Sequence, residues 1–186
     1  MSHLYAEAYN KLAVAKAEQS LNTAIMLCKK ALEYDPSYSI AYGNLGAYYY
    51  QQGRMREAIS AYERTIEFLP DLPELWHALG RAYWSAGRSD RAVEAWRRAV
   101  NIKSDFAEAY NDLGVAYTIS GQYYNAIEAY KKAIKIEPDH ADTYYNLGLV
   151  YERTSQWANA IAMYKEAVRI NPEFTEALSR LKNIGH

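Results

Sequence analysis

The sequence has little cysteine, glycine or proline. Cys28 is the single cysteine among 186 residues, which excludes a disulfide framework within the chain. Only four histidines accompany it, widely spaced, so a cysteine-rich zinc site is excluded as well. Nine glycines and five prolines are too few for the many tight turns of an all-β protein. These shortages favour a helical protein in a reducing, cytoplasmic environment.

Charge of one sign and long apolar runs are also missing. The 21 basic and 22 acidic residues nearly cancel, so we expect no nucleic-acid partner. No apolar run reaches the length of about 18 residues that a bilayer span requires, and we expect no membrane insertion. No catalytic or cofactor-binding motif is present, so the sequence predicts neither enzymatic activity nor a cofactor or metal.

Half of the residues are apolar, and 19 of the 186 are tyrosines. Apolar residues recur with a period of 34 residues, which is the sign of a repeat architecture. The alanines on this period are Ala24, Ala58, Ala92, Ala126 and Ala160, and the prolines are Pro36, Pro70, Pro138 and Pro172.

Each period also contains an aromatic residue, a Leu-Gly step and a tyrosine at spacings of three and four, which is typical of one helix face. The Leu-Gly glycines are Gly46, Gly80, Gly114 and Gly148. A second glycine follows at Gly53, Gly87 and Gly121, and Ser155 replaces it in the fifth unit. Glycine there can end a helix in the left-handed conformation. Each unit is therefore predicted to be helix A, a tight turn and helix B.

This pattern resembles the tetratricopeptide repeat, and the resemblance covers nearly the whole chain. It implies an all-α fold, a right-handed superhelix of antiparallel helix pairs forming one domain over residues 1–186. The first repeat is degenerate, and the helix at 175–186 is expected to cap the array. The expected repeats are 6–38, 39–72, 73–106, 107–140 and 141–174.

Small residues at the Leu-Gly step and at the centre of helix B let the two helices of a unit approach closely. Cys28 occupies the helix B position that holds Tyr62, Trp96, Tyr130 and Tyr164 in the other units. We interpret it as a small buried core residue and not as a nucleophile.

The first unit has apolar residues where the others are polar. Met26 lies in the position of Ser60 and Glu94, so helix B of this unit is apolar on every side. Such a helix is normally covered. We expect this end to continue into a longer array or to self-associate, through Leu4, Tyr5, Met26 and Leu27.

In the family, ligands lie along helix A, and the same helix positions can be read here. Three asparagines partly resemble those with which the repeat array of O-linked N-acetylglucosamine transferases holds a peptide backbone, although Ala78 and Asp112 interrupt the row. A second group combines two aromatic rings, Tyr50 and Trp84, with His77 and Arg81. It is a suitable anchor for a carboxylate or a peptide side chain. The predicted groove residues are Asn44, Tyr50, His77, Arg81, Trp84, Asn111, Asp112, Tyr145, Asn146 and Arg153.

The sequence thus predicts a non-catalytic scaffold that binds a protein or peptide partner. Two alternatives stay open at this stage. The chain could form a homo-oligomeric scaffold through its first repeat, or it could be the substrate-recognition array of a larger enzyme.

Overall fold

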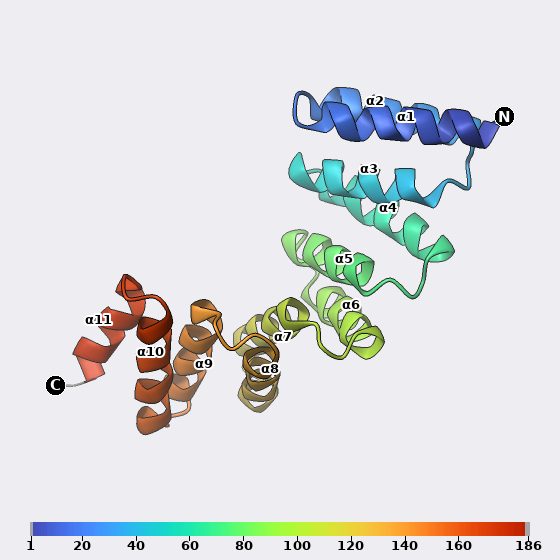
Figure 1. The fold of residues 1–186 in the computed structure, drawn as a ribbon. Helices are drawn as coiled ribbons and strands as arrows, with labels where there is room; N and C mark the ends of the chain where they lie inside the picture. Colours follow the sequence, from blue (N-terminus) through green and yellow to red (C-terminus); the bar gives the residue numbers. More distant parts are fainter. Residues whose placement is uncertain (1, 185–186) are drawn as a thin grey trace. The chain divides into compact units, whose positions relative to one another are not determined.

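The structure, a computed structural model, describes residues 2–184 (Figure 1). These residues form eleven α-helices and no strand, as the all-α prediction requires. The helices are α1 (Ser2–Ala17), α2 (Leu21–Tyr34), α3 (Ser39–Gln51), α4 (Met55–Phe68), α5 (Pro73–Ser85), α6 (Ser89–Ile102), α7 (Ala107–Ile119), α8 (Tyr123–Ile136), α9 (Ala141–Arg153), α10 (Trp157–Ile170) and α11 (Thr175–Ile184).

The helices pack in consecutive pairs, and each helix B also touches the helix A that follows it within the same unit. Contacts between residues divide the chain into two compact units, Met1–Ile102 with three helix pairs and Lys103–His186 with two pairs and α11. The expectation of one domain stays a prediction. Because each pair packs on its sequence neighbours, stability is approximately a sum of local terms and neighbour terms.

The close approach of helix A to helix B explains the Leu-Gly step. A Cβ atom built on Gly148 would lie 2.5 Å from Cε1 of Tyr164, and one on Gly114 would lie 2.5 Å from Cε1 of Tyr130. Both tyrosine side chains are almost completely buried. No side chain fits between backbone and ring at these positions, so the glycines are required by packing and not by backbone conformation.

The turn between helix A and helix B has the predicted left-handed residue. Gly53, Gly87 and Gly121 have φ angles of 74°, 73° and 73°, and Ser155 takes the same conformation at 60°. In the Ser155 turn, the amide of Gln156 donates to the carbonyl oxygen of Tyr151 at 2.8 Å. This bond closes the helix end in the manner of a glycine-capped helix.

The first helix pair departs from the others, as the sequence indicates. Helix α1 has 16 residues, whereas the other A helices have 13. Ala13 takes the place of the Leu-Gly glycine and packs, fully buried, in the same core as the buried Cys28. Burial raises the pKa of the Cys28 thiol to about 12, which agrees with its interpretation as a core residue.

Candidate functional site

In the first compact unit, residues 1–102, the A helices α3 and α5 bring three side chains together near their C-terminal ends. From here on, the first and second unit are the two compact units and not single repeats. The guanidinium of Arg81 lies over the ring of Tyr50, with its Cζ atom 5.4 Å from the ring centroid. The hydroxyl of Tyr50 lies 3.3 Å from Oγ of Ser85. Arg81 is exposed, whereas Tyr50 is half-buried. The ring and the serine therefore hold a cation at the surface in a defined place.

Trp84 belongs to the same end of α5 but is partly used in packing. Its ring lies 5.8 Å from the ring of Trp96 on α6, at an interplanar angle of 45°. The indole Nε1 of Trp96 in turn donates to the backbone carbonyl of His77 at 3.2 Å. Trp84 thus connects the predicted groove cluster to the core of its helix pair.

Asn44 has a structural bond that the sequence did not indicate. Its side-chain amide donates to Oδ1 of Asn10 on α1 at 2.9 Å, and Asn10 is buried. The bond joins the first and second helix pairs. A buried amide needs such a partner, because an unpaired polar group inside the protein is costly.

A similar bond joins the two helix pairs of the second unit. The hydroxyl of Thr143 on α9 donates to Oδ1 of Asn111 on α7 at 3.2 Å, and Nδ1 of His140 lies 2.7 Å from the same hydroxyl oxygen. The ring of His140, in the turn before α9, thus contacts the side chain of Thr143.

Tyr145 lies in a network around Glu152. Nη1 of Arg180 on α11 donates to one carboxylate oxygen of Glu152 at 2.8 Å, and the hydroxyl of the buried Tyr164 donates to the other at 2.7 Å. Arg180 is also hydrogen-bonded to Tyr145, whose ring lies 5.1 Å from that of Phe174. Burial and the bond to Glu152 raise the pKa of Tyr164 far above its usual range.

The remaining predicted groove residues also belong to the second unit. Asp112 and Asn146 are half-buried, and Arg153 is exposed at the end of α9. The ten predicted residues therefore divide equally between the two units. Tyr50, Arg81 and Trp84 form the cluster of the first unit, and we call it the Arg81 cluster. A peptide-binding role for any of these residues stays a prediction.

The predicted self-association surface is apolar and exposed, with one correction. Leu4, Tyr5 and Met26 are 66%, 54% and 50% exposed, and Leu12 on α1 is 46% exposed. Leu27, however, is 6% exposed and belongs to the core, so its inclusion in this surface was wrong. Leu27 follows Met26 on α2, and one residue along a helix rotates the side chain by about 100° around the axis. The side chain of Leu27 therefore points toward the core, whereas that of Met26 points to solvent.

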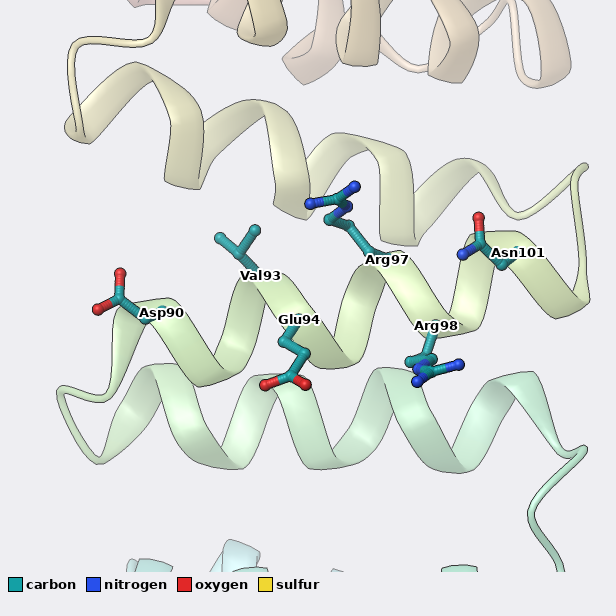
Figure 2. A pocket seen from close by; sticks show the side chains of 6 residues that line it. All are labelled: Asp90, Val93, Glu94, Arg97, Arg98 and Asn101. Carbon is teal, nitrogen blue, oxygen red and sulfur yellow. The ribbon is translucent and has the colours of Figure 1, made fainter.

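A hollow of about 310 Å³ lies along the outer face of α6. Figure 2 shows acidic side chains in its N-terminal half and basic ones in its C-terminal half. Asp90 lies in the first turn of α6, where the helix dipole favours an acid, but no basic residue lies in the last turn. Charges of both signs along an exposed helix face are ordinary, and we assign no ligand to this hollow. The hollow is lined by Asp90, Val93, Glu94, Arg97, Arg98 and Asn101.

Comparison with known proteins identifies the repeat. The TPR repeat family matches residues 80–119 and 116–155, and the tetratricopeptide repeat family matches residues 2–71 and 141–174. The chain belongs to the tetratricopeptide repeat family. Among curated proteins, none matches the sequence.

Solved structures of tetratricopeptide repeat (TPR) proteins are similar over nearly the whole chain. A crystal structure of MamA is 27% identical with a TM-score of 0.85, covering 92% of this chain and 94% of that one. YrrB, described as a TPR protein with an unusual peptide-binding site, is 26% identical with a TM-score of 0.82, covering 94% and 90%. MamA from Desulfovibrio magneticus RS-1 is 18% identical with a TM-score of 0.84, covering 91% and 97%, and supports the fold alone.

These similarities confirm the αα-superhelix class of the TPR fold, and they support a protein-interaction scaffold. Within residues 2–184, no helix combines the length and the apolar character needed to cross a membrane. The same residues contain no group of three or more histidine, cysteine or acidic side chains placed to hold a metal ion.

The sequence analysis did not predict some of the residues that hold the candidate site residues in place. Arg180 is not among the predicted groove residues, yet it lies on the last helix and reaches back to Glu152. The period itself contained the signal, because Arg180 stands 34 residues after Asn146 and so occupies a groove position of helix A. The bonds of Asn10 and Thr143 had no such signal, since they depend on side-chain conformations.

Proposed function

We propose that the chain is a non-catalytic adaptor that binds a protein through an extended peptide segment lying on the A helices of the first unit. In this proposal, Arg81 holds a carboxylate of the peptide, either an acidic side chain or the C-terminal group. The observation that carries it is the exposed guanidinium placed over the ring of Tyr50.

The geometry favours a carboxylate for a physical reason. A guanidinium presents several N–H donors in one plane, which match the two oxygens of a carboxylate. Because the Tyr50 ring restricts the place of the Arg81 side chain, less conformational entropy is lost when a ligand binds. The Trp84 ring, half-buried beside it, offers apolar area for the next side chain of the peptide. The similarity to YrrB adds support for a peptide ligand.

A library of ten-residue peptides displayed on phage tests this proposal. Selection on the wild-type chain should enrich peptides that share an acidic residue or a free C-terminus. The Arg81→Glu variant should lose these peptides by about tenfold or more in affinity, because a charge-assisted bond becomes a repulsion. Arg98→Glu is the matched control, an exposed arginine of α6 with the same charge change.

Equal binding by wild type and Arg81→Glu would contradict the proposal, provided that circular dichroism shows both to be folded. Trp84→Ala is a poorer test, because the loss of its packing on Trp96 also changes stability. Tyr50→Phe keeps the ring under Arg81 and removes only the hydroxyl bond to Ser85, so it should bind nearly as well as the wild type.

We also propose, as a second function, that α1 and α2 mediate association with another copy of the chain. Leu4, Tyr5 and Leu12 are all exposed and lie within about 100° of one another around α1. Met26 adds an exposed apolar side chain on α2. Apolar residues gathered in this way are typical of an interaction surface.

Static light scattering over a range of protein concentrations tests self-association. The mean mass of the wild type should rise with concentration, and Met26→Glu should shift the rise to higher concentration. Ser60→Glu, in the equivalent position of the next repeat, is the control and should behave as the wild type. A monomeric mass for the wild type at all concentrations would exclude this second function. A cytoplasmic location and the alternative of a recognition array within a larger enzyme stay predictions.

A further inference from the structure

A second pocket lies in the first unit, between the two B helices α4 and α6, with α5 as its floor. Its volume is about 320 Å³, at the small end of the range of ligand pockets. It is lined by Glu63, Ile66, Glu67, Trp76, Leu79, Tyr83, Arg91, Glu94 and Ala95. None of these residues belongs to the Arg81 cluster.

The pocket and the Arg81 cluster use different sides of α5. Leu79 and Tyr83 lie two residues before and after Arg81, which turns their side chains by about 200° around the helix axis. Ligands on the two sides would therefore contact different residues. A test of one site leaves the other intact.

The floor of the pocket is aromatic and well ordered. The indole Nε1 of Trp76 donates to the carbonyl oxygen of Pro70 at 2.7 Å, which fixes the ring. The hydroxyl of Tyr83 donates to Oε1 of Glu63 at 2.5 Å. Burial, together with this bond, raises the pKa of Tyr83 to about 12, so its hydroxyl stays a donor to Glu63 at neutral pH.

The walls carry an excess of negative charge. Glu63 and Glu67 stand on α4 and Glu94 on α6, and Arg91 is the single basic residue of the lining. Arg91 pairs with Glu94 at 3.5 Å, and Arg64 of α4, just outside the lining, pairs with Glu67. With Arg64 counted, one net negative charge remains beside the aromatic floor, and the carboxylate of Glu63 carries it. Flat aromatic rings beside carboxylates are the environment that a guanidinium prefers.

Other repeats show that these walls are not required by the fold. Sixty-eight residues later, the floor positions hold Tyr144, Leu147 and Tyr151, which conserve the aromatic and apolar character. The wall positions of Glu63, Glu67 and Glu94, however, hold Lys131, Lys135 and Ala162 there. One repeat earlier, the same wall positions hold Lys29, Glu33 and Ser60. The floor residues are therefore explained by helix packing. Of the three sets of wall positions compared, the set at this pocket is the one in which all three residues are acidic.

We propose that this pocket binds an arginine side chain of a protein partner, with the guanidinium over Trp76 and between the carboxylates of Glu63 and Glu94. The aliphatic part of the arginine packs on Ile66, a partly exposed apolar residue of the lining. This gives the chain a partner-binding site on the B-helix side of the first unit, separate from the peptide site on the A helices.

Titration with the peptide acetyl-Gly-Ser-Arg-Ser-Gly-amide, followed by the ¹⁵N-indole signals, tests the proposal. The chain has four tryptophans, and the Trp76 signal is assigned by its disappearance in Trp76→Phe. Addition of the peptide should shift the Trp76 signal and leave those of Trp84 and Trp157 in place. The same peptide with citrulline in place of arginine has the same shape without the charge, and it should cause no shift.

The double variant Glu63→Gln/Glu94→Gln should weaken binding by about tenfold, as expected for the loss of two exposed charge pairs. Glutamine keeps a carbonyl acceptor for Tyr83, so the fold is retained. Glu128→Gln, in the position of Glu94 one repeat later, is the matched control and should leave the Trp76 shift unchanged. An equal shift with citrulline, an undiminished shift in the double variant, or no shift at millimolar peptide would each overturn the proposal.

Discussion

Replacement of Gly148 by alanine should destabilise the protein, although alanine is the better helix former. A Cβ atom at this position would lie 2.5 Å from Cε1 of Tyr164, whereas carbon atoms in contact normally stand about 3.5–4.0 Å apart. The ring would have to move by about 1 Å. Tyr164 is fully buried and bonded to Glu152 at 2.7 Å, so it has little freedom to move.

Overpacking of a buried site typically costs about 1–3 kcal/mol, and the gain in helix propensity from glycine to alanine offsets about 1 kcal/mol of it. We expect a net loss of up to about 2 kcal/mol in the free energy of unfolding. Urea denaturation followed by far-UV circular dichroism measures this loss as a lower midpoint.

Gly43→Ala is the matched control. Gly43 is also inside an A helix, but a Cβ atom there would meet Thr65 at 3.7 Å, an ordinary contact distance. It should be neutral or stabilising by up to about 1 kcal/mol. The chain itself contains the compensating pair, because Ala13 stands with Cys28 in the first repeat where others have glycine and an aromatic residue.

Gly148→Ala should therefore cost less in a Tyr164→Cys background than in the wild type, a coupling that a double-mutant cycle measures. If Gly148→Ala and Gly43→Ala were equally stable, the explanation of the Leu-Gly step by ring contact would be refuted.

Three further predictions follow from buried polar and ionisable groups. Because Cys28 is fully buried and its thiol pKa is raised to about 12, Ellman's reagent at pH 8 should modify it at least about a hundredfold faster in denaturant than in the native protein. Burial raises the pKa of Tyr62, Tyr83 and Tyr130 to about 12 from an ordinary value of 10, so between these pH values only the unfolded chain ionises, and the urea midpoint should fall as pH rises through that window. A midpoint that is constant up to pH 12 would contradict this. Asn44→Ala removes the donor to buried Asn10 and should lower the free energy of unfolding by about 1–3 kcal/mol, measured by urea denaturation, whereas an unchanged midpoint would mean that Asn10 finds another partner.

The sequence predicted the elements of this fold well because the packing positions repeat. Gly46 and its equivalents mark each contact between helix A and helix B, and the left-handed turn was predicted at Gly53, Gly87 and Gly121. Ser155 has the same conformation, which the sequence did not predict for a serine. At each of the glycine positions, local steric limits restrict the residue type, so the position can be recognised in a single sequence. The helix pairs followed from the residue spacing, and the αα-superhelix class from the resemblance to the tetratricopeptide repeat.

The candidate site was predictable only in outline. The period gives the direction of each side chain from its helix, but not the partner that it meets. Trp84 was therefore placed correctly on α5, whereas its packing on Trp96 was not foreseen as a contact between helices A and B. Leu27 was wrongly placed at the surface. Helix α2 is apolar on every side, so residue type alone does not show which of Met26 and Leu27 faces solvent.

The division of contacts after Ile102 affects how unfolding can be observed. Trp76, Trp84 and Trp96 all lie in the first unit, while Trp157 in the second is 50% exposed. Tryptophan emission therefore reports mainly on the loss of the first unit, and helical circular dichroism reports on both. A variant in the second unit, such as Gly148→Ala, should move the dichroism curve while leaving the emission curve nearly in place, so that comparison of the two signals measures how cooperatively the units unfold.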